Sequence, residues 1–232
     1  MLTIRRARER GHADHGWLQS WHSFSFADYH DADHMGFSEL RVINEDFVQP
    51  GQGFGTHPHR DMEILTWVLE GALEHKDSMG NGSAILPGEM QYMSAGTGVT
   101  HSEFNHSREE VVHLLQIWIT PNERGAKPRY GQKNFAEMLA SERLGLLASP
   151  DGRDGSIAIR QDARVHGART RAAREFSIEL AAGRSAWLQI ARGSVRLDAE
   201  ALLQGDGVAI EKEKKLSIRT EPGAEFLLFD LP

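Results

Sequence analysis

The chain has 232 residues, of which 40% are hydrophobic and 25% are charged, and its formal net charge is −7 at pH 7. This composition is typical of a soluble globular protein with a sizeable core and argues against disorder. The chain has no cysteine, which excludes disulfides and thiolate metal sites. Its acidic balance disfavours binding to a nucleic-acid backbone.

Targeting signals are not evident in the sequence. Residues 1–10 contain four arginines and no apolar run of the kind a secretory signal needs. No apolar stretch is long enough to span a bilayer. We therefore expect a cytoplasmic protein that associates neither with a membrane nor directly with nucleic acid.

Short apolar segments separated by glycine-rich turns dominate the first half of the chain. Segments 62–70 and 111–119 are too apolar for strands with one wet face, so they are predicted to be buried on both faces. Such strands at this spacing are typical of a sandwich or barrel. The predicted strands cover residues 21–26, 37–48, 62–70, 72–77, 91–94 and 111–119.

The second half repeats this pattern after a connection over residues 120–170, which is rich in turn residues and is predicted to hold one short helix at 134–143. From residue 176 the β pattern returns, and Trp187-Leu-Gln-Ile-Ala followed by Arg-Gly193 echoes Trp67-Val-Leu followed by Glu-Gly71. We interpret this as an internal repeat of one β unit. The predicted domains are 1–130 and 131–232.

Candidate metal ligands gather between residues 51 and 105. His57 and His59 are two residues apart, as are His101 and Glu103, so each pair projects to one face of a strand. Imidazole and carboxylate together suit a divalent transition metal. Glu63, which alternation would place on the same face as His57 and His59, competes with Glu103 for the carboxylate position. The second half of the chain has no His-x-His pair, so the second copy of the β unit is predicted to bind no metal.

These residues resemble two cupin motifs. Gly51-x5-His57-x-His59-x3-Glu63-x7-Gly71 resembles the first, with its last spacing one residue longer than usual. Gly96-x-Gly98-x2-His101-x3-Asn105 resembles the second, with glycine in place of the usual proline. The sequence around these motifs resembles the pirin family, most strongly over residues 10–130. The resemblance lies in Trp21-His-Ser-Phe-Ser-Phe, Leu40-Arg-Val-Ile-Asn-Glu-Asp, Val68-Leu-Glu-Gly and His101-Ser-Glu.

The resemblance implies an all-β bicupin, in which two β-barrels of the double-stranded β-helix type face each other. The N-terminal barrel would bind one metal through His57, His59, His101 and Glu103, and the C-terminal barrel would be degenerate. Glu63 would then be either an acceptor of the kind that orients an imidazole N–H group or an ion-pair partner. We interpret the other N-terminal histidines as structural, namely His12, His15, His22, His30, His34, His75, His106 and His113.

The family resemblance also implies an activity. Bacterial members are associated with quercetin 2,3-dioxygenase activity, so we expect a metal-dependent oxidoreductase that opens a flavonol ring with O₂. Glu103 would be its catalytic base. Fe(II) is the expected metal, with Cu, Ni, Co, Mn or Zn as alternatives. The main alternative function is a non-catalytic, metal- and redox-dependent partner of a transcription regulator, which would use a basic surface over residues 164–174. Other cupin chemistry on an unknown substrate is a third hypothesis.

Overall fold

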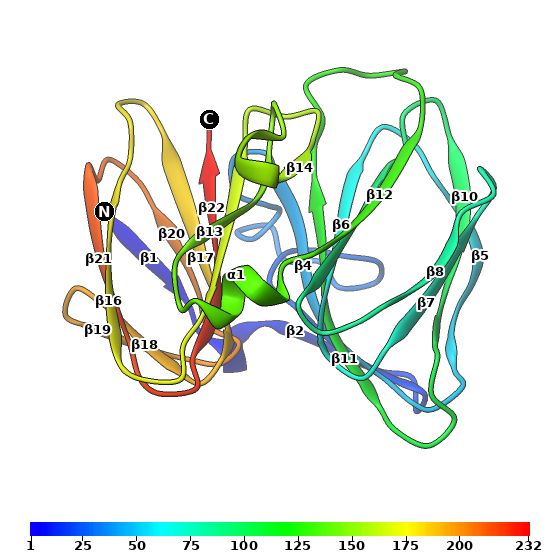
Figure 1. Ribbon diagram of the computed structural model, residues 1–232, viewed down its shortest axis with the longest axis horizontal. Coiled ribbons are helices and arrows are strands. Elements are labelled where there is room, and N and C mark those ends of the chain that lie inside the picture. Colours follow the sequence, from blue (N-terminus) through cyan, green and yellow to red (C-terminus); the bar gives the residue numbers. More distant parts are fainter. The chain divides into compact units, whose positions relative to one another are not determined.

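The computed structural model describes residues 1–232, and nearly all its elements are strands, so the predicted all-β class is confirmed (Figure 1). The chain forms two compact units. The N-terminal domain comprises Gly11–Phe135 with Ile159–Gln161, and the C-terminal domain comprises Met1–Arg10, Ala136–Ala158 and Asp162–Pro232. No helix has the length and apolar character needed to cross a membrane.

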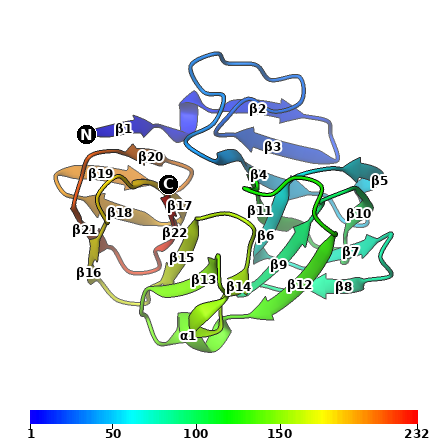
Figure 2. The ribbon, with the colours of Figure 1, turned by 90° about the horizontal axis from the view of Figure 1, so that it is seen from above.

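The N-terminal domain consists of two antiparallel sheets. The larger has the strand order β12-β9-β6-β11-β4-β3-β2, and the smaller has the order β5-β10-β7-β8. Figure 2 shows β5, β10, β7 and β8 lying together within this domain. Its strands are β2 (Gly11–Asp14), β3 (Leu18–His22), β4 (Leu40–Val48), β5 (Gly53–His59), β6 (Glu63–Glu70), β7 (Leu73–Asp77), β8 (Gly82–Ile85), β9 (Glu89–Ser94), β10 (Val99–Asn105), β11 (Val112–Ile119) and β12 (Arg129–Asn134).

One core joins the two sheets of this domain. Val68 of β6 and Leu114 of β11 pack in the same buried cluster as Leu73 of β7 and Ile85 of β8. β6 is buried over seven of its eight residues, as its continuous apolar run predicts. The core fills only part of the barrel, because polar side chains occupy the interior around Thr66 and Glu103.

The C-terminal domain also has a large and a small sheet. Their orders are β1-β20-β17-β22-β15-β13-β14 and β16-β21-β18-β19. The elements are β1 (Leu2–Arg5), η1 (Ala7–Glu9), α1 (Ala136–Ala140), β13 (Gly145–Ser149), η2 (Arg153–Gly155), β14 (Ile157–Ala158), β15 (Arg164–Arg169), β16 (Arg174–Glu179), β17 (Ser185–Arg192), β18 (Ser194–Leu197), β19 (Glu200–Leu203), β20 (Gly207–Ile210), β21 (Lys215–Thr220) and β22 (Glu225–Leu231).

The strand orders confirm the internal repeat. The run β9-β6-β11-β4 corresponds to β20-β17-β22-β15, and β5-β10-β7-β8 corresponds to β16-β21-β18-β19. β16 and β21 therefore occupy the places of β5 and β10, which carry the predicted ligands. The side chains that they contribute to the core are apolar, namely Phe176, Ile178, Leu216 and Ile218. Apolar packing thus replaces the ligand positions in the second barrel.

The structure differs from the predicted division of the chain at residue 130. β1 pairs with β20 from Leu2↔Ile210 to Arg5↔Gly207, so residues 1–10 belong to the C-terminal domain. In Figure 2, β1 lies beside β20 in the place that β12 takes beside β9. The edge of the second sheet is completed by the chain's own beginning, which local sequence patterns do not reveal.

Two local predictions also need correction. The segment expected as a connection, residues 120–170, contains β12, β13, β14 and β15 as well as the short helix. The many turn residues of this segment lie between the strands, and for this reason the sequence pattern did not reveal the strands. The strand predicted at 21–26 is instead β3 at Leu18–His22, and Ser23 to Phe26 form irregular backbone.

Candidate metal centre

Two neighbouring strands place three histidines together. β10 pairs with β5 so that His101 lies opposite His57 and Val99 lies opposite His59. Nε2 of His101 is 3.0 Å from Nε2 of His57 and 2.9 Å from Nε2 of His59. A cation with metal–nitrogen bonds of about 2.1 Å holds adjacent ligand nitrogens roughly 3.0 to 3.4 Å apart in octahedral or tetrahedral geometry. The spacing of the three imidazoles therefore fits a single ion.

The protonation states of the imidazoles suit metal binding. Burial, reinforced by the neighbouring His57 and His59, lowers the pKa of His101 to about 2. Burial and His57 lower the pKa of His59 to about 4. Nδ1 of His57 lies 2.7 Å from the carbonyl oxygen of Gly55, so this nitrogen donates and leaves Nε2 as a lone pair facing the cluster. The three imidazoles, with their Nε2 atoms directed at one another, form a histidine-triad metal site.

Glu103 lies on the same strand, and a β-bulge separates it from His101. Its carboxylate accepts hydrogen bonds from Nε2 of Gln116, at 3.2 and 3.0 Å, and from Thr66, at 3.4 Å. Burial raises the pKa of Glu103 to about 7, and the charge of Asp46 adds to this effect. One oxygen of Glu103 lies within 4.8 Å of ligand nitrogens of His101 and His75. Glu103 is thus positioned beside the triad, next to its most buried member.

Glu63 does not have the contacts predicted for it. Its carboxylate accepts hydrogen bonds from Tyr92 at 2.5 Å, from Ser94 at 2.5 Å and from the backbone N–H of Arg160 at 2.8 Å, rather than from an imidazole. The reason is strand parity. A turn at residues 60–62, where Asp61 has φ 47°, separates β5 from β6 and breaks the alternation that starts at His57. Ile64 therefore faces the cavity and Glu63 faces away.

The triad opens into a cavity of about 530 Å³ within the N-terminal domain. Two of the triad histidines contact aromatic rings. The ring of Trp118 meets His59 edge-on at 4.9 Å and Phe26 at 5.3 Å. Phe54 lies 6.5 Å from His57 and 5.3 Å from Trp17, as ring centroids. These rings give the cavity apolar walls suited to a flat aromatic ligand.

A polar group of residues also lines the cavity. It comprises Ser20 and His22 of β3 with Asn44 and Asp46 of β4. Nδ1 of His22 lies 2.8 Å from the side-chain oxygen of Asn44, and Ser20 donates to Asp46. Sequence patterns did not identify this group, although alternation along 37–48 could have marked Asn44 and Asp46 as sharing a face. His22 was interpreted as structural and in fact borders the cavity.

Both domains and the triad define a bicupin with one metal centre in its N-terminal barrel. Residues 3–119 match the Pirin family model, and residues 146–231 match the model described as the quercetinase C-terminal cupin domain. The chain belongs to the pirin family.

Relatives match the whole length of the chain. It is 50% identical over 232 residues to the quercetin 2,3-dioxygenase of Escherichia coli K12, covering 100% of this chain and 99% of that protein. It is 41% identical to a pirin-like protein of Caulobacter vibrioides, with 95% of each covered. The structure of the bacterial pirin YhhW of Escherichia coli in complex with nickel(II) aligns with a TM-score of 0.95 and 50% identity, covering 100% of this chain and 99% of that one.

Proposed function

We propose that this protein is a metal-dependent dioxygenase that opens the ring of a flavonol such as quercetin with O₂. The observation that carries the proposal is the convergence of three imidazoles at an aromatic-walled cavity. Relatives named quercetin 2,3-dioxygenase, at 50% identity over the whole chain, support the same reaction. A flavonol is planar and aromatic, which suits walls formed by Trp118, Phe26 and Phe54.

We assign the ligands as His57, His59, His101 and Glu103. The first three supply Nε2 atoms already spaced for one ion, and Glu103 would complete the set from the adjacent inward position of β10. Fe(II) is our first choice, with Ni(II), Cu, Co and Mn as alternatives, and nickel is the ion in the similar YhhW structure. When bound, a redox-active cation lowers the pKa of a coordinated hydroxyl and offers open positions to substrate and O₂.

Glu103 is our catalytic base. In the metal-free protein burial raises the pKa of Glu103 to about 7, whereas a bound cation would keep the carboxylate ionised and able to accept the proton of the flavonol hydroxyl. Gln116 fixes this carboxylate by donating to both oxygens. The overall reaction adds both atoms of O₂ across the heterocycle, opens it to an ester and releases carbon monoxide. The apolar walls exclude water from the reacting ring.

The polar group on β3 and β4 would hold the hydroxyl groups of the substrate. Asp46 provides an acceptor and Asn44 provides an amide in the same cavity as the triad. A polyhydroxylated ring bound at the metal would extend its remaining hydroxyls along the wall. This complements the aromatic walls, because polar groups orient a ligand that apolar surface binds.

The test is reconstitution of metal-free protein with Fe(II), Ni(II), Co(II), Cu(II) and Mn(II) in turn, followed by quercetin absorbance and carbon monoxide release. We expect turnover with at least one ion. His59→Ala should abolish turnover, whereas the control His106→Ala should not, because His106 is an exposed histidine just after β10. Stoichiometric metal binding without turnover for every ion would refute the proposal.

The structure offers no observation that favours the alternative of a regulator-binding surface. The basic residues that would form it have acidic partners within the C-terminal domain, namely Arg164 with Asp230 at 3.0 Å, Arg169 with Glu225 at 2.8 Å and Arg174 with Glu142 at 3.2 Å. The cytoplasmic location expected from the sequence stays a prediction.

A further inference from the structure

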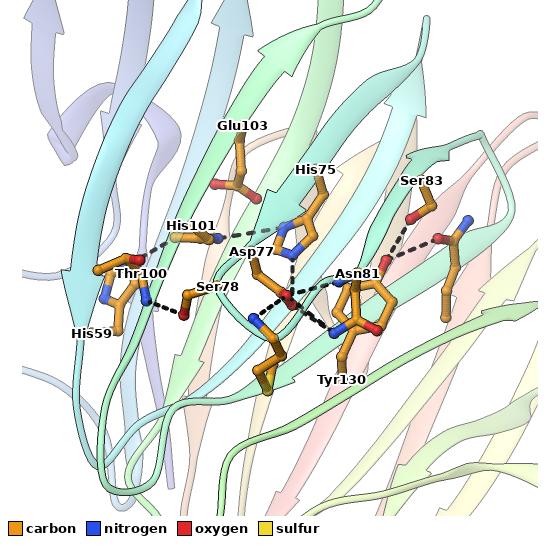
Figure 3. A network of polar contacts seen from close by, with 12 residues as sticks. His59, His75, Asp77, Ser78, Asn81, Ser83, Thr100, His101, Glu103 and Tyr130 are labelled. Atoms are coloured by element: carbon orange, nitrogen blue, oxygen red, sulfur yellow. Dashed lines mark hydrogen bonds and ion pairs between the residues drawn. The ribbon is translucent and has the colours of Figure 1, made fainter.

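His101 has an additional hydrogen-bond partner behind the triad. While its Nε2 faces His57 and His59, its Nδ1 lies 3.4 Å from Nδ1 of His75. Nε2 of His75 in turn lies 3.4 Å from Oδ2 of Asp77 (Figure 3). These contacts form a line of three side chains, from His101 through His75 to Asp77. The strand register explains this line, since on β7 and β10 His75 is opposite Glu103 and Asp77 is opposite His101. The side chains of His75 and Asp77 are both fully buried.

We infer that His75 and Asp77 form a positioning pair that fixes the tautomer and ring orientation of His101 for metal binding. The inference rests on the proposed metal centre but not on the identity of the substrate. Neither residue lines the cavity, and the mechanism above gives neither a role. Buried partners of this kind are what holds a ligating imidazole in place.

Only one arrangement of protons satisfies every group in the line. If Nε2 of His101 offers its lone pair to an ion, the proton lies on Nδ1, which must donate to Nδ1 of His75. His75 then carries its proton on Nε2 and donates it to Asp77, a carboxylate that can only accept. Both contacts, at 3.4 Å, are longer than the usual hydrogen-bond distance of about 2.7 to 3.2 Å. A cation on His101 would strengthen its Nδ1–H as a donor.

The turn after β7 fixes the acceptor end of the line. Oδ1 of Asp77 accepts the backbone N–H groups of Met79 at 2.8 Å and Asn81 at 3.0 Å. Nδ2 of Asn81 also donates to both oxygens, at 3.1 and 2.9 Å. The carboxylate therefore cannot rotate freely, and Oδ2 is the oxygen presented to His75. On the other side, His75 stacks on the ring of Tyr130 with 5.0 Å between centroids and 26° between planes.

This constraint makes Asp77→Asn a directional test. The two backbone donors require the amide oxygen of the new side chain at the Oδ1 position, so its NH₂ group faces Nε2 of His75. His75 must then accept there and donate from Nδ1, which forces the proton of His101 onto Nε2, the atom that should bind the ion. An isosteric substitution that leaves packing intact should therefore weaken metal binding.

The experiment measures Co(II) and Ni(II) dissociation constants by chelator competition, with no substrate present, and records the visible Co(II) spectrum. We expect Asp77→Asn and His75→Phe each to weaken binding about 10- to 100-fold and to shift the Co(II) bands. His75→Gln should restore binding to within about threefold, because its carbonyl can accept from His101 while its amide donates to Asp77.

His113 provides the matched control. It is a buried histidine in the same domain that bonds Glu45 at 2.9 Å and stacks on Phe47, but it does not contact the triad. His113→Phe should leave the dissociation constants unchanged even if it lowers stability. Wild-type affinity in Asp77→Asn and His75→Phe would overturn the inference, as would equal weakening in His113→Phe. If wild-type protein binds metal as expected yet does not turn over quercetin, only the proposed reaction fails.

Discussion

Asp46 gives the sharpest prediction about stability. It lies on β4, lines the cavity and is buried. Burial raises its pKa from an ordinary value of 3.8 to about 7, with the charge of Glu45 adding to the rise and the hydrogen bond from Ser20 opposing it. Asp46→Asn removes the titration while keeping the shape and an acceptor for Ser20. The variant therefore isolates the cost of an ionised carboxylate at this site.

The sign follows from proton uptake. Between pH 3.8 and about 7, Asp46 is protonated in the folded protein and ionised in the unfolded chain, so the unfolded state binds fewer protons and stability falls as pH rises. Each pH unit costs about 1.4 kcal/mol. Between pH 5 and pH 8 this cost accrues over about two pH units, from pH 5 to the pKa of about 7. The free energy of unfolding of the wild-type protein should therefore fall by roughly 3 kcal/mol, a loss that Asp46→Asn does not show.

Urea denaturation of metal-free protein at pH 5, 6, 7 and 8 would measure this difference. Four of the five tryptophans lie in the N-terminal domain, so fluorescence reports mainly on the domain that contains Asp46. The free energy of unfolding of Asp46→Asn, relative to wild type, should increase with pH and level off above pH 7. Asp33→Asn, an exposed control, should show no trend. A flat difference for Asp46→Asn would refute the reasoning.

Three further predictions concern the site and the second barrel. Glu103→Gln should abolish quercetin turnover from pH 5 to pH 9 without changing the circular dichroism spectrum, because an amide cannot accept the proton. Retained turnover would exclude Glu103 as the base. Trp118→Leu should raise KM for quercetin by about 2- to 12-fold, the equivalent of one aromatic contact of ~0.5–1.5 kcal/mol, at unchanged metal content. Ile218→Ala should lower the free energy of unfolding by about 2–5 kcal/mol in urea titrations, since it leaves a cavity in the core of the C-terminal domain. Ni(II) affinity should stay unchanged, because the proposed ligands lie in the N-terminal domain.

The sequence was most informative where chemistry and strand alternation coincide. His57, His59 and His101 could be placed at one site, because spacing of two residues on a strand puts side chains on one face, and the structure brings their Nε2 atoms together. The same rule failed for Glu63, because a turn separates it from β5 and alternation does not continue through a turn. The alternation of side chains between two faces holds only within one uninterrupted strand.

His75 shows a signal that was present but not used. His75 and Asp77 are two residues apart on a segment predicted as a strand, so their shared face was available from the sequence. What sequence could not give is the register that places His75 behind His101 rather than against the other sheet. The pairing of β1 with β20 has the same cause, since partners more than 200 residues apart are chosen by tertiary packing.

The two barrels show what the metal site costs the fold. In the C-terminal barrel, Phe176, Ile178, Leu216 and Ile218 fill the interior and need no partners. In the N-terminal barrel, the corresponding strands β5 and β10 bring in imidazoles and a carboxylate that burial penalises, as the pKa values of His101 and Glu103 record. A bound cation offsets this penalty, because it supplies the charge that inward lone pairs and an ionised carboxylate require. The N-terminal domain should therefore gain more stability from metal than any single side chain in its interior provides, and the C-terminal domain should gain none.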